Sequence, residues 1–198
     1  MSLARRVLVA GTSGGVGTTT VTALLFSAMT EAGAATAPTL ADHTGGDLGT
    51  RLSEGDDTHP VDTDLLLHDL GAHATTALIE HLAEPQVFGV IVAATSPYGF
   101  AAAHRALAAI RDRHGASGVR RVFVAAVGSF GTHPTSAATE ALQNEFGRGI
   151  VVVVPPDPAL AAGGRVPRGR ISDETRVAQT SLADQLRERM RGYRAPAD

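Results

Sequence analysis

A short apolar segment runs directly into a glycine-rich turn near the start of the chain, and this junction constrains the fold most. Val7–Ala10 has the composition of a buried strand, and Gly11–Gly17 contains four glycines before a helix-forming segment that begins at Thr18. A strand that turns at once into a helix is typical of α/β folds. The N–H groups exposed by the glycines, together with the positive end of the following helix, form a site for phosphate oxygens. A tight turn without a ligand is the alternative interpretation.

Apolar, β-branched runs alternate with alanine-rich segments of helical length along the chain. We expect strands at Val7–Ala10, Thr39–Ala41, Asp64–Asp69, Val87–Ala94, Arg121–Val127 and Ile150–Val154. We expect helices at Thr18–Ala32, Thr75–Ala83, Phe100–His114, Ser136–Phe146 and Asp173–Arg191. Because several strand runs are apolar on both faces, the pattern predicts an α/β fold with a doubly wound, mainly parallel sheet and helices on both faces. A ligand crevice is expected at the carboxyl ends of the strands.

Length and composition favour one domain. The chain has 198 residues, of which 43% are apolar, which is enough for one buried core and short for two catalytic domains. We expect residues 1–192 to form this domain and residues 193–198 to be a frayed tail. No apolar run reaches the roughly 18 residues of a membrane span, so a cytoplasmic protein is expected.

The charged and sulfur-containing residues exclude several classes of function. Cysteine is absent, which excludes disulfide scaffolds, Cys-ligated zinc, Fe–S clusters and thiol catalysis. All 17 basic residues are arginine, so no mechanism that needs a lysine ammonium is possible, even from a second copy of the chain. A net charge of −3 argues against a general nucleic-acid surface.

The loop also resembles a known nucleotide-binding motif. Residues 13–20 read Ser-Gly-Gly-Val-Gly-Thr-Thr-Thr and resemble the deviant Walker A loop of the ParA/MinD group of P-loop ATPases, Lys-Gly-Gly-x-Gly-Lys-Thr-Thr. Ser13 stands where the family has the signature lysine that reaches across a dimer, and Thr18 where it has the lysine on the β- and γ-phosphates. The resemblance implies nucleotide contacts from Ser13, Gly14, Gly15, Val16, Gly17, Thr18, Thr19 and Thr20. Losing two cationic contacts costs several kcal/mol, so we expect hydrolysis to be slow or absent.

Acidic residues after two strands carry the resemblance further. The segment 40–52 looks like the one after the second strand in the CpaE/TadZ branch of this group, where the replacement found at Thr18 is also common. Asp42 would then orient or activate the attacking water. Asp69 ends a buried strand, as in the Walker B position, and would hold Mg²⁺ together with the hydroxyl of Thr19. The alternative is that Asp42 stabilises a turn and that Asp69 does so or caps a helix.

A proline-rich segment near the end of the chain resembles the part of these proteins that contacts the nucleotide base. Pro155 and Asp157 fit its Pro-x-Asp pattern, although a loop defined by its prolines is compatible with the same residues. The chain departs from the family at residues 124–128, Val-Ala-Ala-Val-Gly, where nucleotide-binding relatives often have an asparagine. Adenine specificity is therefore not implied.

Histidines gather around Asp69 in the sequence. His68, His73 and His81 would have to converge to bind a metal, but His68 and Asp69 are adjacent and point to opposite faces of a strand. A pH-sensitive surface is the simpler interpretation. The last expected helix has an apolar stripe, and we expect it to pack on the sheet rather than on a membrane.

Taken with the resemblance, these features predict a degenerate ParA/MinD-like protein. We expect a nucleotide-binding or pseudo-ATPase scaffold whose ligand is ATP or ADP with Mg²⁺. It would act as a homodimer or through a protein partner in positioning or secretion machinery. One alternative is a slow Mg²⁺-dependent ATPase in which arginine replaces the lost lysines. Another is a dinucleotide-binding module, because Gly11-x-x-x-Gly15-x-Gly17 resembles the turn of short-chain dehydrogenases, although their Tyr-x-x-x-Lys chemistry is excluded here.

Overall fold

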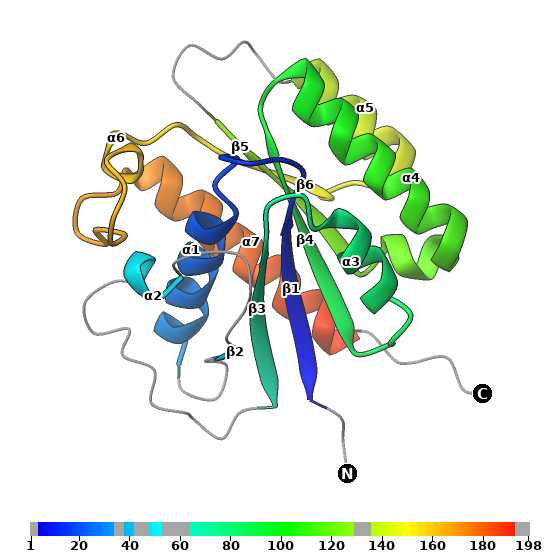
Figure 1. Cartoon of the computed structure of the whole chain (residues 1–198), viewed down its shortest axis with the longest axis horizontal. Coiled ribbons are helices and arrows are strands. Elements are labelled where there is room, and N and C mark those ends of the chain that lie inside the picture. Colours follow the sequence, from blue (N-terminus) through cyan, green and yellow to red (C-terminus); the bar gives the residue numbers. More distant parts are fainter. Residues whose placement is uncertain (1–3, 34–37, 42–47, 53–63, 129–135, 193–198) are drawn as a thin grey trace.

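The computed structural model describes residues 4–33, 38–41, 48–52, 64–128 and 136–192. Its centre is a six-stranded sheet in the order β2-β3-β1-β4-β5-β6, and every neighbouring pair is parallel (Figure 1). The strands are β1 Arg5–Gly11, β2 Thr39–Ala41, β3 Leu65–Gly71, β4 Val87–Ala94, β5 Val122–Val127 and β6 Val151–Val154. The first strand therefore lies inside the sheet, and the chain winds outward from it in both directions.

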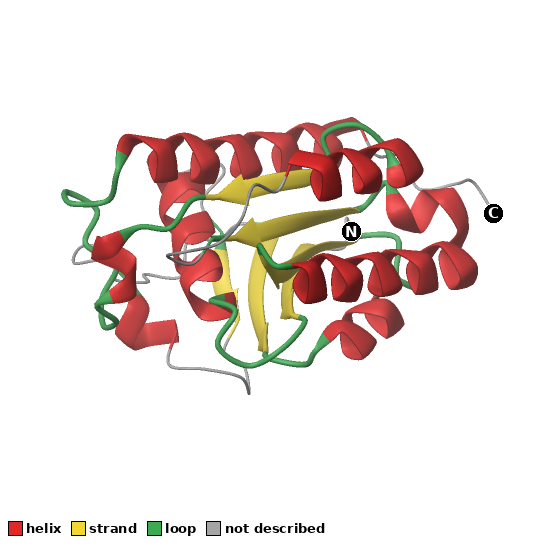
Figure 2. Ribbon diagram, turned by 90° about the horizontal axis from the view of Figure 1, so that it is seen from above, coloured by secondary structure: helices red, strands yellow, loops and turns green. Residues whose placement is uncertain are grey.

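Helices cover both faces of this sheet (Figure 2). They are α1 Thr18–Glu31, α2 Leu48–Arg51, α3 Thr75–His81, α4 Pro97–Val119, α5 Ser136–Phe146, α6 Pro158–Ala161 and α7 Asp173–Gly192. Alternate residues of β1 pack on opposite faces of the sheet. Val7 and Val9 pack into the core under α1 and α7, whereas Leu8 and Ala10 pack into the core under α3, α4 and α5. The α/β class and the doubly wound parallel sheet predicted from the sequence are confirmed.

Most predicted elements are present, and the differences have local causes. The helix predicted to begin at Phe100 begins at Pro97, because the Ser96 hydroxyl caps it by accepting from the Gly99 N–H at 3.1 Å. It also continues to Val119 through a break at Gly115, where φ is 63° and ψ is −164°. The short helices α2 and α6 were not predicted, since four residues are too few for a helical period to show.

The last helix buries its apolar stripe inside the protein, as expected. Ala178, Leu182, Leu186 and Met190 belong to the core that also holds α1. Among the described residues, no helix has the length and apolar character needed to cross a bilayer. Residues 193–198 lie outside the described residues, so the predicted domain boundary at residue 192 stays a prediction.

Candidate functional site

The glycine loop sits at the carboxyl edge of the sheet, between β1 and α1. Two backbone hydrogen bonds hold its beginning, one from the Thr12 N–H to the Val92 carbonyl at 2.9 Å and one from the Ala74 N–H to the Gly11 carbonyl at 3.2 Å. These bonds tie the loop to β4 on one side and to the turn after β3 on the other. The loop therefore has a fixed position at the edge where ligands bind in open α/β sheets.

Two glycines give the loop its shape. Gly15 has φ of 73° and Gly17 has φ of 86°, a left-handed conformation that residues with a Cβ rarely adopt. Gly17 is the N-cap of α1 and offers no side chain to the first turn of the helix. Within the described residues, no hydrogen-bond partner is found for the N–H groups of Gly15, Val16 and Gly17. These donors, with the positive end of α1, are available to an anion.

The two positions that would carry lysine in the ParA/MinD motif contribute no charge. Thr18 is only 6% exposed, and its hydroxyl oxygen lies so close to Gly11 that a Cβ there would collide with it. Ser13 is half-buried in the loop itself. Thr19 is the second residue of α1, and Thr20 follows it. Residues 13–17 thus form the loop and residues 18–20 the start of α1, and none of them has a charged side chain.

A cavity of about 280 Å³ opens beside this loop. Its walls come from the loop and the start of α1, from the ends of β5 and β6, and from α6. The lining residues are Gly15, Val16, Gly17, Thr20, Val21, Leu24, Arg51, Val127, Gly128, Val154, Pro155, Pro156, Asp157, Leu160 and Ala161. The volume is close to the lower end of the roughly 300–1,000 Å³ common for small-molecule sites, and the walls are mainly apolar.

Close packing of Gly128 against Pro156 forms one side of the cavity. A Cβ on Gly128 would lie 2.7 Å from the Pro156 Cδ, so any side chain here would push the proline segment away. The backbone of Gly128 therefore lies directly against the proline segment. Among the described residues that line the cavity, none has a side-chain amide.

Asp157 lines the same cavity, but its carboxylate is already engaged. Oδ1 accepts from the Ala159 N–H at 2.9 Å and caps α6, and Oδ2 accepts from the Ser172 N–H at 2.8 Å. Burial raises the pKa of this carboxyl, but the hydrogen bonds from Ser172, Thr175 and Ala159 outweigh burial, so its pKa lies below the ordinary value. Asp157 therefore ties the Pro155 segment to the start of α7.

Asp69 is in the opposite situation. It is 1% exposed, and its Oδ1 accepts from the Gly71 N–H at 2.8 Å, but its buried Oδ2 has no hydrogen-bond partner among the described residues. The buried hydroxyl oxygens of Thr12 and Thr95 also lack partners there, and these two residues follow β1 and β4, which end at the same edge of the sheet. A buried carboxylate oxygen without a partner is costly unless a ligand or hydrated cation satisfies it. Because Mg²⁺ prefers oxygen ligands and retains several waters, this arrangement fits a Mg²⁺ ion.

Two residues that the sequence did not assign to the site belong to it. His73 has φ of 57°, and its Nε2 accepts from the Gly14 N–H at 3.2 Å. Arg51 lines the cavity, and its Nη1 donates to the Gly164 carbonyl at 3.0 Å. The nearness of His73 to the strand end at Gly71 was a possible signal, whereas the position of Arg51 depends on tertiary packing alone.

Other sequence-based predictions have mixed outcomes. Asp42, the candidate catalytic acid, lies outside the described residues. Among the residues that the structure describes, no group of three or more His, Cys, Asp or Glu side chains could hold a metal ion.

Known proteins resemble this chain in fold rather than in sequence. No protein-family model matches the chain, and no curated protein is significantly similar to it. One solved structure that resembles it is a ParA family ATPase from Chlorobium tepidum TLS, with a TM-score of 0.49 and 14% sequence identity. The match covers 94% of this chain and 97% of the other. At this identity, the likeness carries no argument about what the chain binds.

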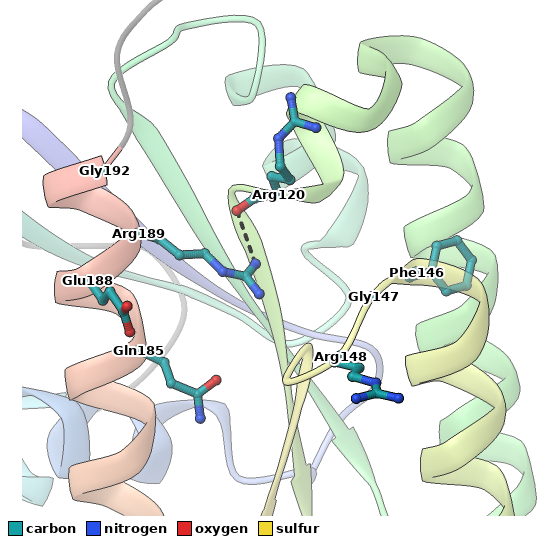
Figure 3. Close-up of a pocket in the computed structure, with 8 residues that line it drawn as sticks. All are labelled: Arg120, Phe146, Gly147, Arg148, Gln185, Glu188, Arg189 and Gly192. Atoms are coloured by element: carbon teal, nitrogen blue, oxygen red, sulfur yellow. Dashed lines mark hydrogen bonds between the residues drawn. The ribbon is translucent and has the colours of Figure 1, made fainter.

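A second, larger cavity of about 640 Å³ lies at the opposite edge of the sheet (Figure 3). Three arginines line it, Arg120, Arg148 and Arg189. The Arg189 Nη1 donates to the carbonyls of Arg120 and Val122 at 3.0 and 3.1 Å, and its guanidinium carbon lies 3.9 Å from the Phe123 ring centroid. In Figure 3 the side chains of Arg120 and Arg148 extend away from Arg189. The guanidinium of Arg189 is therefore held by protein groups, and the three arginine side chains do not converge on one point of the cavity.

Proposed function

We propose that this chain is a nucleotide-binding scaffold of ParA/MinD type that binds ATP or ADP with Mg²⁺ and hydrolyses ATP very slowly or not at all. The observation that carries the proposal is the set of free N–H groups of Gly15, Val16 and Gly17 at the carboxyl edge of the sheet. Donors of this kind, held at the start of a helix, bind phosphate oxygens without needing a side chain.

The neighbouring cavity suits the rest of a nucleotide. It continues from the loop to the Pro155 segment and is bounded by Val127 and Gly128. In this arrangement the phosphates would face the loop and the base would lie between apolar walls. Base selection would be weak, because the asparagine common in relatives is missing at the end of β5.

Magnesium is part of the proposal. Asp69 through its free Oδ2, and Thr19 through its hydroxyl, are the residues that would hold it. When bound, Mg²⁺ would neutralise part of the phosphate charge. This neutralisation would contribute more to binding here than in a loop with two lysines, because Ser13 and Thr18 supply no positive charge. Asp69 would act mainly through water, as carboxylates at the end of a strand commonly do in such sites.

Slow or absent hydrolysis follows from the missing charge. The transferred phosphoryl group develops charge that P-loop enzymes stabilise with lysine, arginine and Mg²⁺. Ser13 and Thr18 supply no cation, so the loop binds the ground state better than it stabilises a transition state. We therefore propose that the protein works in the cytoplasm through dimerisation or binding of a protein partner, in positioning or secretion machinery.

Calorimetry with ATP, ADP and NAD in the presence of Mg²⁺, with light scattering on the same samples, tests this function. We expect micromolar binding of ATP or ADP, weaker binding of NAD, and a mass increase to a dimer with ATP. Tighter binding of NAD would favour the dinucleotide-binding alternative. Absence of binding for all three, or hydrolysis at ordinary ATPase rates, would contradict the proposal.

A slow ATPase is a second candidate, favoured by Arg51. Its guanidinium is the basic group that lines the loop cavity within the described residues, and a modest shift from the Gly164 carbonyl would bring it toward bound phosphate. Arginine binds phosphate through a planar pair of N–H groups. If phosphate release by the purified protein is unchanged in both Arg51→Gln and Asp42→Ala, this candidate loses its support.

A further inference from the structure

We propose that His73 is a phosphate-binding residue that becomes protonated when an anion enters the glycine loop. It would thereby supply the positive charge that Ser13 and Thr18 lack. The inference deepens the proposed function and rests on it, since both concern the same loop. It assigns the recognition of phosphate to a side chain from the turn after β3.

The first observation is the hydrogen bond between His73 and the loop. Nε2 accepts from the Gly14 N–H at 3.2 Å, so this ring nitrogen acts as an acceptor toward the loop. The donor that it occupies belongs to the same loop as the free N–H groups of Gly15, Val16 and Gly17. In the free protein, the imidazole nitrogen therefore takes a place that a phosphate oxygen would take.

The second observation is the backbone of His73. It is the one residue other than glycine with positive φ among the described residues, at 57°. Strained backbone is kept where the surrounding structure requires a particular side-chain direction, and it often marks a binding site. Here the turn from Gly71 to α3 aims the ring at the loop.

The charges around His73 come from neighbouring elements rather than from the loop. The loop residues 11–18 carry no ionisable side chain, and Ala74 separates His73 from Thr75, the first residue of α3. On β3 and α3, and on β1 and α4, which pack against α3, the ionisable groups are Arg5, Arg6, His68, Asp69, Glu80, His81, Tyr98, His104, Arg105, Arg111, Asp112, Arg113 and His114. Asp69 is the carboxylate that precedes this turn, with Oδ1 bound to Gly71.

Anion binding would break the hydrogen bond between His73 and the loop and favour protonation of the ring. A phosphate oxygen would take the Gly14 N–H, and Nε2, released from that bond, would bind a proton from solvent and donate it to the same anion. Histidine is the side chain whose charge most readily changes between pH 5 and 8. Proton uptake and anion binding would therefore be linked, and each would strengthen the other.

Sulfate is a suitable probe, because its charge does not change over this pH range, unlike that of a terminal phosphate. We would measure sulfate affinity at constant ionic strength at pH 8 and pH 5.5 for the full chain, its His73→Gln variant and its His81→Gln variant. His81 is an exposed histidine at the end of α3 and serves as the matched control. NMR of the imidazole nitrogens would report the protonation of His73 directly.

We expect sulfate affinity to rise about tenfold from pH 8 to pH 5.5 in the unmodified protein and in His81→Gln, with little rise in His73→Gln. Sulfate should also convert the His73 Nε2 signal to that of a protonated nitrogen. Equal affinity at both pH values, a full rise in His73→Gln, or an Nε2 that stays unprotonated with sulfate bound would overturn the assignment of His73. Those results would leave the proposed function standing if Mg²⁺-ADP still binds. Absence of binding for both sulfate and Mg²⁺-ADP would overturn the two together.

Discussion

The two edges of the sheet offer opposite combinations of charge and hydrogen-bond donors. The cavity at the amino edge has three arginines, but Arg189 is bound to two carbonyls and a ring, and Arg120 and Arg148 extend away from it. The cavity at the carboxyl edge has a loop without charged side chains but with free, fixed N–H groups. The proposed anion site is therefore distinguished by available donors in a fixed geometry rather than by the number of arginines.

The largest expected effect is the loss of nucleotide binding when Gly15 is changed. Gly15→Ala places a Cβ at φ of 73°, and the loop would relieve the strain by turning its N–H groups away from the ligand. We expect the affinity for Mg²⁺-ADP, measured by calorimetry, to fall about 100-fold, which corresponds to about 2.8 kcal/mol.

A matched control for this change lies at the other edge. Gly149 follows Arg148 and also has φ of 73°. Gly149→Ala and Gly15→Ala should each lower the free energy of unfolding by about 1 kcal/mol, but only Gly15→Ala should weaken binding. If Gly149→Ala weakens binding as much, the assignment of the site to the carboxyl edge is wrong.

The next largest effect concerns Asp157, whose two oxygens accept backbone N–H bonds. Asp157→Asn places an N–H₂ group against one of these donors and should lower the free energy of unfolding by about 2 kcal/mol at pH 7. Because the native pKa of Asp157 is depressed, its contribution is present above the unfolded pKa of about 4 and is lost as pH falls further. Urea unfolding at pH 7 and at pH 3 should show the difference from the unmodified protein narrowing, and the exposed Asp112→Asn should show no difference.

Asp69 should respond in the opposite direction. Asp69→Asn keeps an acceptor for the Gly71 N–H and removes the buried oxygen Oδ2, which has no partner among the described residues. We expect the free energy of unfolding without Mg²⁺ to rise by about 1 kcal/mol, while the gain in ATP affinity caused by Mg²⁺ disappears. A loss of stability similar to that of Asp157→Asn would show that Asp69 has a structural role only.

The smallest expected effect separates the arginines of the two edges. Arg51→Gln should weaken Mg²⁺-ADP binding about fivefold, because Arg51 lines the loop cavity and is partly exposed to solvent. The double variant Arg120→Gln with Arg148→Gln should leave the affinity within about twofold. A stronger effect of the double variant, measured by calorimetry at the same ionic strength, would favour the arginine-lined cavity as the anion site.

Sequence periodicity was sufficient for the fold but not for all of the site. The apolar runs placed β1 to β6 and the long helices to within a few residues, because burial on both faces leaves a clear pattern. The loop 13–20 was found because glycines at a strand-to-helix junction are a local signal. His73 and Arg51 were missed as site residues because their roles depend on which turns the sheet brings together. The hydrogen bond that Asp157 accepts from Ser172 could not be predicted either, since the two residues are 15 positions apart in the chain.

The most direct test of the central claim is NMR of the protein labelled with ¹⁵N at glycine, titrated with Mg²⁺-ADP. The donors of the loop and those of the opposite edge report in the same spectrum, through Gly14, Gly15 and Gly17 on one side and Gly147 and Gly149 on the other. We predict large shifts of the loop amides at ligand concentrations that leave Gly147 and Gly149 unchanged. Shifts at Gly147 and Gly149 with an unperturbed loop would contradict the account.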